Sequence, residues 1–464
     1  MKEKFVFGDS LTVYADKNLC FDELSTLTWG FCGKNIKCEI KEGNDNEIRI
    51  GDADIINLDN GDEYTLNITE TGVAVKGKDR NGLMRGYMSF LMSIVQKSPF
   101  DNKPVFNSTG TSVHGKFLTG NRMAHICIFP ETTFVMFRKL VRLCAVLQYT
   151  HIIIEFWGML KYDCLKELSW PSGFEKSQVK EIIEEAKNLG IIPVPMFNHF
   201  GHASQSRGLN GKHVVLDQNP SLAYLFTPDG WAWDIEREET YSLLATIRKE
   251  LYELFGEGEY IHLGCDEAYI YGHGFTDHKN VAYFFERITN ECVSENRTPI
   301  LWGDMFLCKK ELSDEPIKYE CNAKTPEDAA IIRNVINKKS IIADWHYDVY
   351  DSPWKTSALL NSEGFNIMCC PWFRGQNIRT GVETVKTLGL CGVIQTTWHV
   401  LSSHMHMLYD CAKLTGTYFP DNLSYSVGGH IAATLMRKIS FEDYSYEESG
   451  FAAYQTGTDY RNDV

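Results

Sequence analysis

Short apolar runs recur along most of the chain, and amphipathic stretches separate them. Helical spacing of apolar residues predicts helices at 131–147, 175–190 and 238–255. The apolar runs between such stretches end in polar or aromatic residues, which is typical of buried strands. Eight of these runs follow residue 111, at 122–128, 151–157, 191–197, 260–267, 299–305, 341–347, 365–372 and 392–398.

Strands that alternate with helices predict parallel βα units with right-handed connections. We therefore predict an α/β fold, a (β/α)8 TIM barrel preceded by a small α+β domain. A doubly wound open sheet is the alternative. The number of strands, and the polar or aromatic residues at almost every strand end, favour the barrel.

The first part of the chain has a different pattern. Strand-like alternation occurs at 5–15, 46–51, 64–69 and 73–77, and helical spacing follows from Leu83 to Val95. A segment rich in Pro, Asn and Ser at 98–111 marks a boundary. The predicted domains are an α+β accessory domain at 1–110, the barrel at 111–420, and a C-terminal helical extension packed on the barrel at 421–464.

Composition narrows the class of protein. The 464 residues carry 46 basic and 61 acidic side chains, a net charge of −15, which argues against nucleic acid or an anionic membrane as a partner. No apolar run is long enough for a membrane span, and the N-terminus shows no signal peptide. The fourteen cysteines lie mostly in apolar segments without paired spacing, so we expect reduced thiols and a cytoplasmic protein.

The stretch 260–271 carries the clearest chemical signal. It begins as an apolar strand and ends on two adjacent carboxylates, Asp266 and Glu267. A glycosidase that forms a covalent intermediate needs two carboxyls that flank the scissile bond, about 5 Å apart. Two sequential acids suit that arrangement poorly. They better suit one proton donor and one neighbour that orients a nucleophile carried by the substrate. A structural helix cap is the alternative.

The other strand ends surround the same barrel mouth with aromatic and polar residues. Five of the ten tryptophans lie there. Flat aromatic faces with a few carboxylates and imidazoles are typical of a sugar site, although each tryptophan alone could be barrel packing. The strand-end residues are Glu155, Trp157, Asn198, His199, His202, Trp302, Asp304, Trp345, Tyr347, Trp372, Trp398 and His399.

A metal site is an alternative use of the histidines. His199, His202 and His262 could ligate a metal together with Asp266. The spacing in NHFGH is not specific for metal, and we expect no metal and no other cofactor. Inside a strand, His262 is better explained as a hydrogen-bonded core imidazole that positions the acid pair.

These residues resemble a known family. The segment IHLGCDE is similar to the His-x-Gly-x-Asp-Glu signature of family 20 glycoside hydrolases, the β-N-acetylhexosaminidases, and the hexosaminidase D branch is the most similar. Further resemblance lies in RMAHICI, IPVPMFNHFGHAS, LWGDM, WHY and TTWH, and in the N-terminal NGLMRGYMSFL. The chain departs from the family at Cys265, where many members have glycine, and after the first strand, which continues into IFPET.

The resemblance implies substrate-assisted catalysis through an oxazoline, with an exo-acting, retaining outcome on terminal β-linked N-acetylhexosamine. Glu267 is then the general acid and base, Asp266 orients the acetamido group, and Tyr347 donates a hydrogen bond to the acetamido oxygen. Repulsion between the adjacent acids favours a protonated Glu267. The implied sugar-binding residues are Arg122, His202, Trp302, Asp304, Trp345, Trp372 and Trp398.

The expected partner is therefore a small carbohydrate, with no nucleic acid and no membrane. A homodimer is left open. The competing functions are a non-catalytic carbohydrate-binding barrel and a metal-dependent barrel hydrolase.

Overall fold

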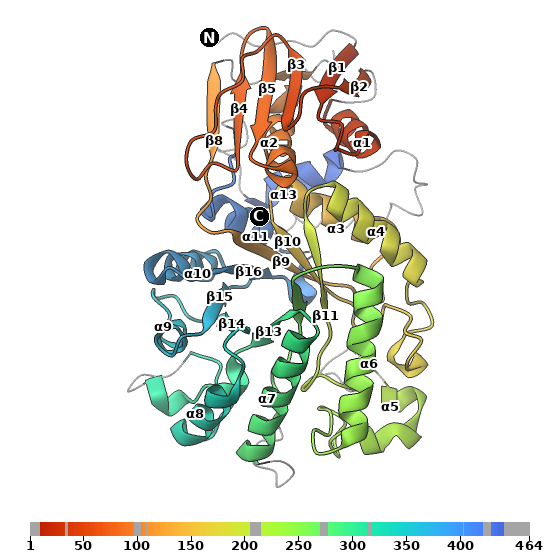
Figure 1. Ribbon diagram of the computed structural model, residues 1–464, viewed down its shortest axis with the longest axis vertical. Helices are drawn as coiled ribbons and strands as arrows, with labels where there is room; N and C mark the ends of the chain where they lie inside the picture. The colour runs from red at the N-terminus through yellow and green to blue at the C-terminus, as the bar shows by residue number, and fades with distance from the viewer. Residues whose placement is uncertain are drawn as a thin grey trace.

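The computed structural model contains a closed barrel of parallel strands and a smaller domain that packs against it (Figure 1). The structure describes residues 10–32, 36–96, 104–106, 110–204, 215–269, 277–312, 318–401, 403–420 and 428–439.

The barrel strands confirm the predicted fold. Each of the eight predicted strands is present, and they pair in parallel in sequence order, with the last strand closing against the first. They are β9 (Asn121–Cys127), β10 (His151–Glu155), β11 (Ile192–Met196), β12 (Tyr260–His262), β13 (Thr298–Trp302), β14 (Ile341–Trp345), β15 (Asn366–Cys370) and β16 (Gly392–Thr396).

Amphipathic helices surround the barrel (Figure 1). Several begin at side-chain caps: Thr133 accepts from the amide of Met136, and Thr325 precedes a proline at the first helical position. The helices are α3 (Phe134–Val146), α4 (Lys176–Asn188), α5 (Val215–Gln218), α6 (Glu238–Phe255), α7 (His278–Ser294), α8 (Pro326–Val335), α9 (Lys355–Ser362), α10 (Gly375–Leu388) and α11 (His406–Leu414).

Side-chain alternation along the strands determines what faces the barrel interior. Met123 and Ile153 belong to a compact apolar cluster that also includes Met196, Ile300 and Met368, one from each of five strands. Residues two positions further along each strand point to the same side. The ends of the strands therefore bring their inward-facing residues together at one mouth of the barrel.

The smaller domain is a six-stranded sheet with two helices. Its strand order is β2-β1-β3-β5-β4-β8, with only β1 and β2 parallel. The helix α2 packs on this sheet. The elements are β1 (Ser10–Ala15), α1 (Phe21–Cys32), β2 (Lys37–Glu42), β3 (Glu47–Gly51), β4 (Tyr64–Ile68), β5 (Gly72–Gly77), α2 (Arg80–Met92) and β8 (Thr111–Gly115). A separate two-stranded pair is formed by β6 (Ile94–Gln96) and β7 (Pro104–Phe106).

The domain boundary lies slightly later than the sequence pattern indicated. The strand β8 pairs with β4 along its whole length, so residues 111–115 belong to the small sheet. The barrel begins with β9 at Asn121. The boundary therefore lies between Gly115 and Asn121 rather than at residue 110.

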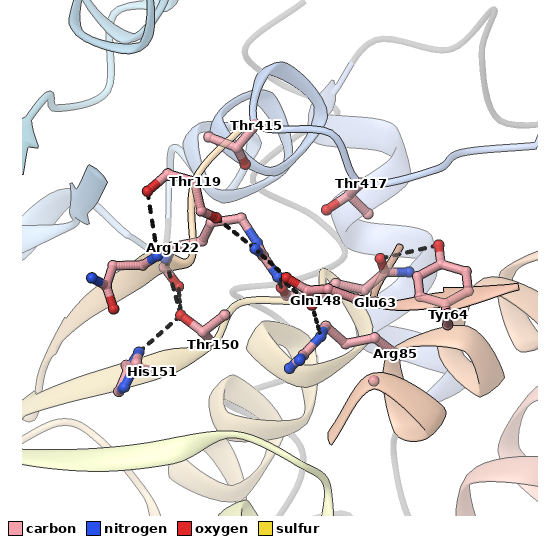
Figure 2. A network of polar contacts seen from close by, with 12 residues as sticks. Glu63, Tyr64, Arg85, Thr119, Arg122, Gln148, Thr150, His151, Thr415 and Thr417 are labelled. Carbon is pink, nitrogen blue, oxygen red and sulfur yellow. Dashed lines mark hydrogen bonds and ion pairs between the residues drawn. The ribbon is translucent and has the colours of Figure 1, made fainter. Parts of the chain in front are cut away.

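A buried polar network joins the two domains at the loops that precede β9 and β10 (Figure 2). The guanidinium of Arg122 donates to both carboxylate oxygens of Glu63, at 3.1 and 3.3 Å, and to the carbonyl oxygen of Thr119 at 2.7 Å. Glu63 also pairs with Arg85 of α2 at 2.6 Å. Arg122 is 2% exposed and the Glu63 side chain is 23% exposed, so the guanidinium is buried while its partner keeps some contact with solvent.

The helix α13 (Gly428–Lys438) fits the predicted C-terminal extension and packs against α3 and α11 of the barrel and against α1 of the small domain (Figure 1). The rest of that predicted extension lies outside the described residues. None of the helices in the described ranges combines the length and apolar character needed to cross a bilayer.

Candidate active site

The acid pair lies directly after β12, at the barrel mouth. The strand ends at His262, so the strand predicted over 260–267 is too long. Gly264, Cys265 and Glu267 have φ angles of 66°, 74° and 50°, and such left-handed residues cannot continue a strand. The resulting turn lets two sequential side chains reach the same side of the mouth.

Gly264 is required in this turn for a second reason. A Cβ at this position would lie 2.3 Å from Oδ1 of Asn198 on the neighbouring strand end. The turn therefore combines a left-handed backbone with close approach to a side chain, and only glycine satisfies both.

The imidazole of His202 holds the two carboxylates together. Its Nε2 lies 3.2 Å from Oδ2 of Asp266 and 3.2 Å from Oε2 of Glu267. The three facing atoms lie within 4.8 Å of one another. The Asp266 side chain is 5% exposed, whereas that of Glu267 is 29% exposed. Glu267 is thus the carboxylate of the pair with access to solvent.

Asp266 has one oxygen that the protein does not satisfy. Its Oδ1 is buried and has no hydrogen-bond partner among the residues that the structure describes. A buried acceptor without a partner is costly, so this oxygen is suited to accept a hydrogen bond from a bound ligand.

Asp304 fixes the backbone of the acid pair. Its Oδ2 accepts hydrogen bonds from the Glu267 amide at 2.9 Å and from Nδ2 of Asn322 at 2.6 Å, and its Oδ1 accepts from Nε1 of Trp345 at 3.1 Å. Burial, followed by the negative charge of Asp266, raises the pKa of Asp304 to about 7. Asp304 is therefore a positioning group behind the acid pair.

Trp231 was not among the residues predicted for the site. Its indole Nε1 donates to the carbonyl oxygen of Glu267 at 2.6 Å, and its ring lies 4.7 Å from that of His202, centroid to centroid. It comes from the long connection between β11 and α6, far from any strand end in sequence. Only the GWAW cluster at 230–233 gives a sequence signal for it.

Predicted aromatic residues form a continuous wall on the other side of the mouth. The ring of Tyr347 lies 5.1 Å from Trp345 and 5.0 Å from Trp372, and its hydroxyl accepts a 2.6 Å hydrogen bond from Nε1 of Trp398. Trp398 in turn lies 5.6 Å from Trp302. Burial raises the pKa of the Tyr347 phenol well above its usual range, so it remains a hydrogen-bond donor.

These five aromatic residues differ in exposure. Trp302 is fully buried and Trp345 nearly so, whereas Tyr347, Trp372 and Trp398 are partly exposed. The exposed rings can stack on a ligand directly. A sugar contact for Trp302 stays a prediction.

A polar cluster on the β9–β11 side of the barrel joins two predicted strand-end residues, Glu155 and Asn198, to His125 and Cys127, which were not predicted. Glu155 accepts hydrogen bonds from Nδ2 of Asn198 at 2.5 Å and contacts Nε2 of His125 at 3.1 Å and Sγ of Cys127 at 3.4 Å. The rings of Phe129 and Trp157, which follow β9 and β10, pack edge to face with centroids 5.0 Å apart. For His125 and Cys127, the only sequence signal was their place inside the apolar run RMAHIC.

The histidines predicted as alternative metal ligands do not converge. His199 bonds to the carbonyl oxygen of Phe197, and burial lowers its pKa to about 3. Nδ1 of His262 accepts from the Gly264 amide, in agreement with the core role expected for it. In the described part of the chain, His202 is the member of this set that groups with Asp266 and Glu267.

Two other groups of donor atoms lie close enough together to hold a metal. One is the buried set His125, Cys127 and Glu155, and the other is the more exposed set Asp59, Asp62 and His114. Lys116 lies 3.5 Å from Asp62 and competes with a cation in the second set.

The prediction for Arg122 is wrong. Arg122 is the second residue of β9. All strands of a parallel barrel begin at the end opposite to the mouth, so Arg122 lies at that opposite end. The two terminal nitrogens of its guanidinium donate to Glu63, Thr119 and Gln148 (Figure 2), whereas Nε has no hydrogen-bond partner among the described residues. The guanidinium also lies 3.5 Å from the ring centroid of Phe117. It therefore serves the domain interface and not the sugar.

Comparison with known proteins identifies the domain. Residues 158–350, which include the acid pair and the WHY segment, match glycosyl hydrolase family 20, catalytic domain. The chain carries the catalytic domain of this family. It is a glycoside hydrolase, so the predicted family and enzyme class are confirmed.

Curated relatives agree with this assignment. The chain is 22% identical to hexosaminidase D from Bos taurus over 274 residues, covering 53% of this chain and 75% of the relative. It is 23% identical to hexosaminidase D from Homo sapiens over 171 residues, covering 33% of each.

Solved structures share the fold of this glycoside hydrolase. A mutant Streptomyces plicatus β-hexosaminidase in complex with its product GlcNAc has a TM-score of 0.67 and 13% identity, covering 97% of this chain and 93% of that one. The family 20 β-N-acetylhexosaminidase of Streptomyces coelicolor has a TM-score of 0.64 and 13% identity, covering 97% and 94%. The likeness extends over both domains.

Proposed function

We propose that this glycoside hydrolase is a retaining exo-β-N-acetylhexosaminidase that releases terminal β-linked N-acetylhexosamine by substrate-assisted catalysis. The observation that carries the proposal is the shared contact of Asp266 and Glu267 with one imidazole nitrogen of His202. The names of the curated relatives and of the solved structures, several of them hexosaminidases, support the same substrate class.

The placement of the two acids argues against an enzyme nucleophile. In glycosidases that form a glycosyl-enzyme, the two carboxyl groups stand on either side of the scissile bond. Here the facing oxygens of Asp266 and Glu267 bind the same nitrogen from one side, and Asp266 is almost completely buried. The attacking atom is then best supplied by the substrate, as the 2-acetamido carbonyl oxygen.

The steps follow from this placement. Glu267 gives its proton to the glycosidic oxygen as the bond from that oxygen to C1 breaks. The acetamido oxygen forms a new bond to C1 and produces an oxazolinium ion. The unpartnered Oδ1 of Asp266 accepts the acetamido N–H and stabilises the positive charge. Water then adds to C1 as Glu267 takes its proton, which restores the acetamido group with retained configuration.

The aromatic wall fits the acetamido group. The Tyr347 hydroxyl accepts a hydrogen bond from Trp398 and donates its own proton to the acetamido oxygen in this proposal. Trp345, Trp372 and Trp398 provide apolar faces for the methyl group and the sugar ring. Asp304 and His202 hold the acid pair in position.

The test compares two leaving groups in two variants. In Glu267→Gln, kcat/KM should fall by about 10²–10⁴-fold for an N-acetylhexosaminide with a poor leaving group. It should fall much less for a 4-nitrophenyl or dinitrophenyl leaving group, which needs little protonation. In Asp266→Asn, kcat/KM should fall for both substrates, because acetamido orientation is required with any leaving group.

Glu286→Gln, an exposed carboxylate on α7, is the matched control and should leave both rates unchanged. A thiazoline mimic of the oxazoline should inhibit the wild-type enzyme at low concentration. Full activity of Glu267→Gln on the poor leaving group, or failure of the mimic to bind, would show that the mechanism is wrong.

We also propose that the enzyme works in the cytoplasm. Its fourteen cysteines are all free thiols, and disulfides form mainly in oxidising compartments. Cell fractionation tests this, since activity confined to a secreted fraction contradicts it. The homodimer stays a prediction.

A further inference from the structure

Three metal-binding side chains meet inside the barrel, on the first two strands. Cys127 and Glu155 are register partners on β9 and β10, and His125 lies two residues before Cys127 on the same face. All three are buried, with exposures of 0% for His125, 4% for Cys127 and 1% for Glu155. Their convergence is therefore dictated by strand register and not by chance contacts of mobile surface side chains.

The separations between the donor atoms are those of a tetrahedral metal site. Nε2 of His125 lies 3.1 Å and Sγ of Cys127 lies 3.4 Å from the same oxygen, Oε2 of Glu155, and the nitrogen and sulfur are 3.8 Å apart. Zinc bonds of about 2.0–2.3 Å place tetrahedral neighbours about 3.3–3.6 Å apart. Each observed separation is within about 0.3 Å of these values.

We propose that His125, Cys127 and Glu155 bind one Zn²⁺ ion that fastens β9 to β10 beneath the active site. The donor set of one nitrogen, one sulfur and one carboxylate oxygen is typical of zinc and unsuited to Mg²⁺ or Ca²⁺, which prefer oxygen. A thiolate and a carboxylate carry two negative charges, which the ion neutralises in this dry environment.

The surroundings support such a site. Asn198 donates a hydrogen bond to Oε1 of Glu155 at 2.5 Å. This contact leaves Oε2 facing Nε2 of His125 and Sγ of Cys127. The ring of His125 packs edge-on against Trp398 and Trp302, at 4.7 and 5.8 Å. Through this imidazole, the ion would hold two aromatic residues of the proposed sugar site in place.

A purely hydrogen-bonded triad is the competing explanation. A protonated thiol and a neutral imidazole could both donate to Glu155 at similar distances. The two explanations differ in what the cluster holds. Zinc displaces the thiol proton of Cys127, whereas the neutral imidazole of His125 keeps one proton in either case, on Nε2 in the triad and on Nδ1 in the metal site.

The test is metal analysis of the full-length protein, purified without an immobilised-metal resin, loaded with Zn²⁺ and passed through a desalting column. We expect about one zinc per chain in the wild type and almost none in Cys127→Ser or His125→Gln. Cys370→Ser is the matched control, because this thiol also faces the barrel interior but lies on β15, outside the cluster. It should retain the full zinc content.

Two further readouts keep the result independent of variant folding and of catalysis. Cobalt(II) in place of zinc should give a thiolate charge-transfer band in the wild type and in Cys370→Ser but not in Cys127→Ser. A chelator should lower the thermal midpoint of the wild type. A folded wild-type protein that retains no zinc after loading overturns the proposal, whatever its activity on hexosaminides.

Discussion

Replacing Arg122 by methionine separates a role in the domain interface from a role in sugar binding. The substitution keeps an aliphatic stem against Phe117 but removes the charge that pairs with Glu63 and the donor to the carbonyl oxygen of Thr119. Breaking a buried ion pair by removing one partner costs about 3–5 kcal/mol. Because Glu63 keeps its contact with Arg85, we expect a value near 3 kcal/mol, the lower end of that range.

A loss of this size should be visible in thermal unfolding. The entropy of unfolding scales with chain length, so about 3 kcal/mol corresponds to a fall of about 3 °C in the thermal midpoint of a chain this long. Arg49→Ala, which removes a partly exposed ion pair with Glu47, is the control and should cost less than about 1 kcal/mol. The double variant with Glu63→Gln should lose less than the sum of the two single variants.

The value of kcat/KM for Arg122→Met distinguishes the interface role from a role in sugar binding. At a temperature well below the unfolding transition, Arg122→Met should keep kcat/KM on a nitrophenyl N-acetylhexosaminide close to the wild-type value. The reason is that Arg122 lies at the end of the barrel opposite to the mouth. A charged hydrogen bond to a sugar hydroxyl is worth about 1.5–3 kcal/mol, or roughly 10–150-fold in kcat/KM. A loss of that size with unchanged stability would refute the interface assignment.

Two other predictions concern the groups around the acid pair. Tyr347→Phe should lower kcat by about 100-fold or more, measured with a nitrophenyl substrate, because it removes a donor to the developing charge; a loss under threefold contradicts that role. Asp304→Asn should change the pH dependence of stability. Burial and the charge of Asp266 raise the pKa of Asp304 to about 7, so the folded state holds a proton that the unfolded chain has lost. The contribution of the protonated Asp304 to the free energy of unfolding therefore falls as pH rises from about 4 to about 7. The thermal midpoints of the wild type and Asp304→Asn should converge or cross in that pH range. Parallel pH curves would refute this assignment.

The barrel was predictable because each strand is a short apolar run bounded by polar residues. The β2 strand of the small domain was missed because KCEIKE is mostly charged and has no buried residue. The α1 helix was also missed, although Leu24, Leu27 and Phe31 on its buried face have helical spacing. The extent of β12 was overestimated for a local reason. Leu263 and the residues after it look like a strand in sequence, but Gly264 and Cys265 adopt left-handed backbone angles.

The candidate site was predictable where it depends on strand ends. Asp304, Trp345 and Tyr347 follow directly from the rule that parallel strands end at one mouth. The same rule excludes Arg122 from the site, since it lies at the start of β9 and therefore at the end of the barrel opposite to the mouth. Trp231 could not be found this way, because it lies between β11 and α6, far from any strand end, and only its contacts with Glu267 and His202 place it at the site.

The measurement that tests the central claim most directly is turnover of paired nitrophenyl β-glycosides that differ only at C2, with an acetamido group in one and a hydroxyl in the other. If the substrate supplies the attacking oxygen, the acetamido compound is hydrolysed and the hydroxyl compound is turned over several orders of magnitude more slowly. Comparable kcat values for the two would contradict the account, because Asp266 and Glu267 would then need no help from the sugar.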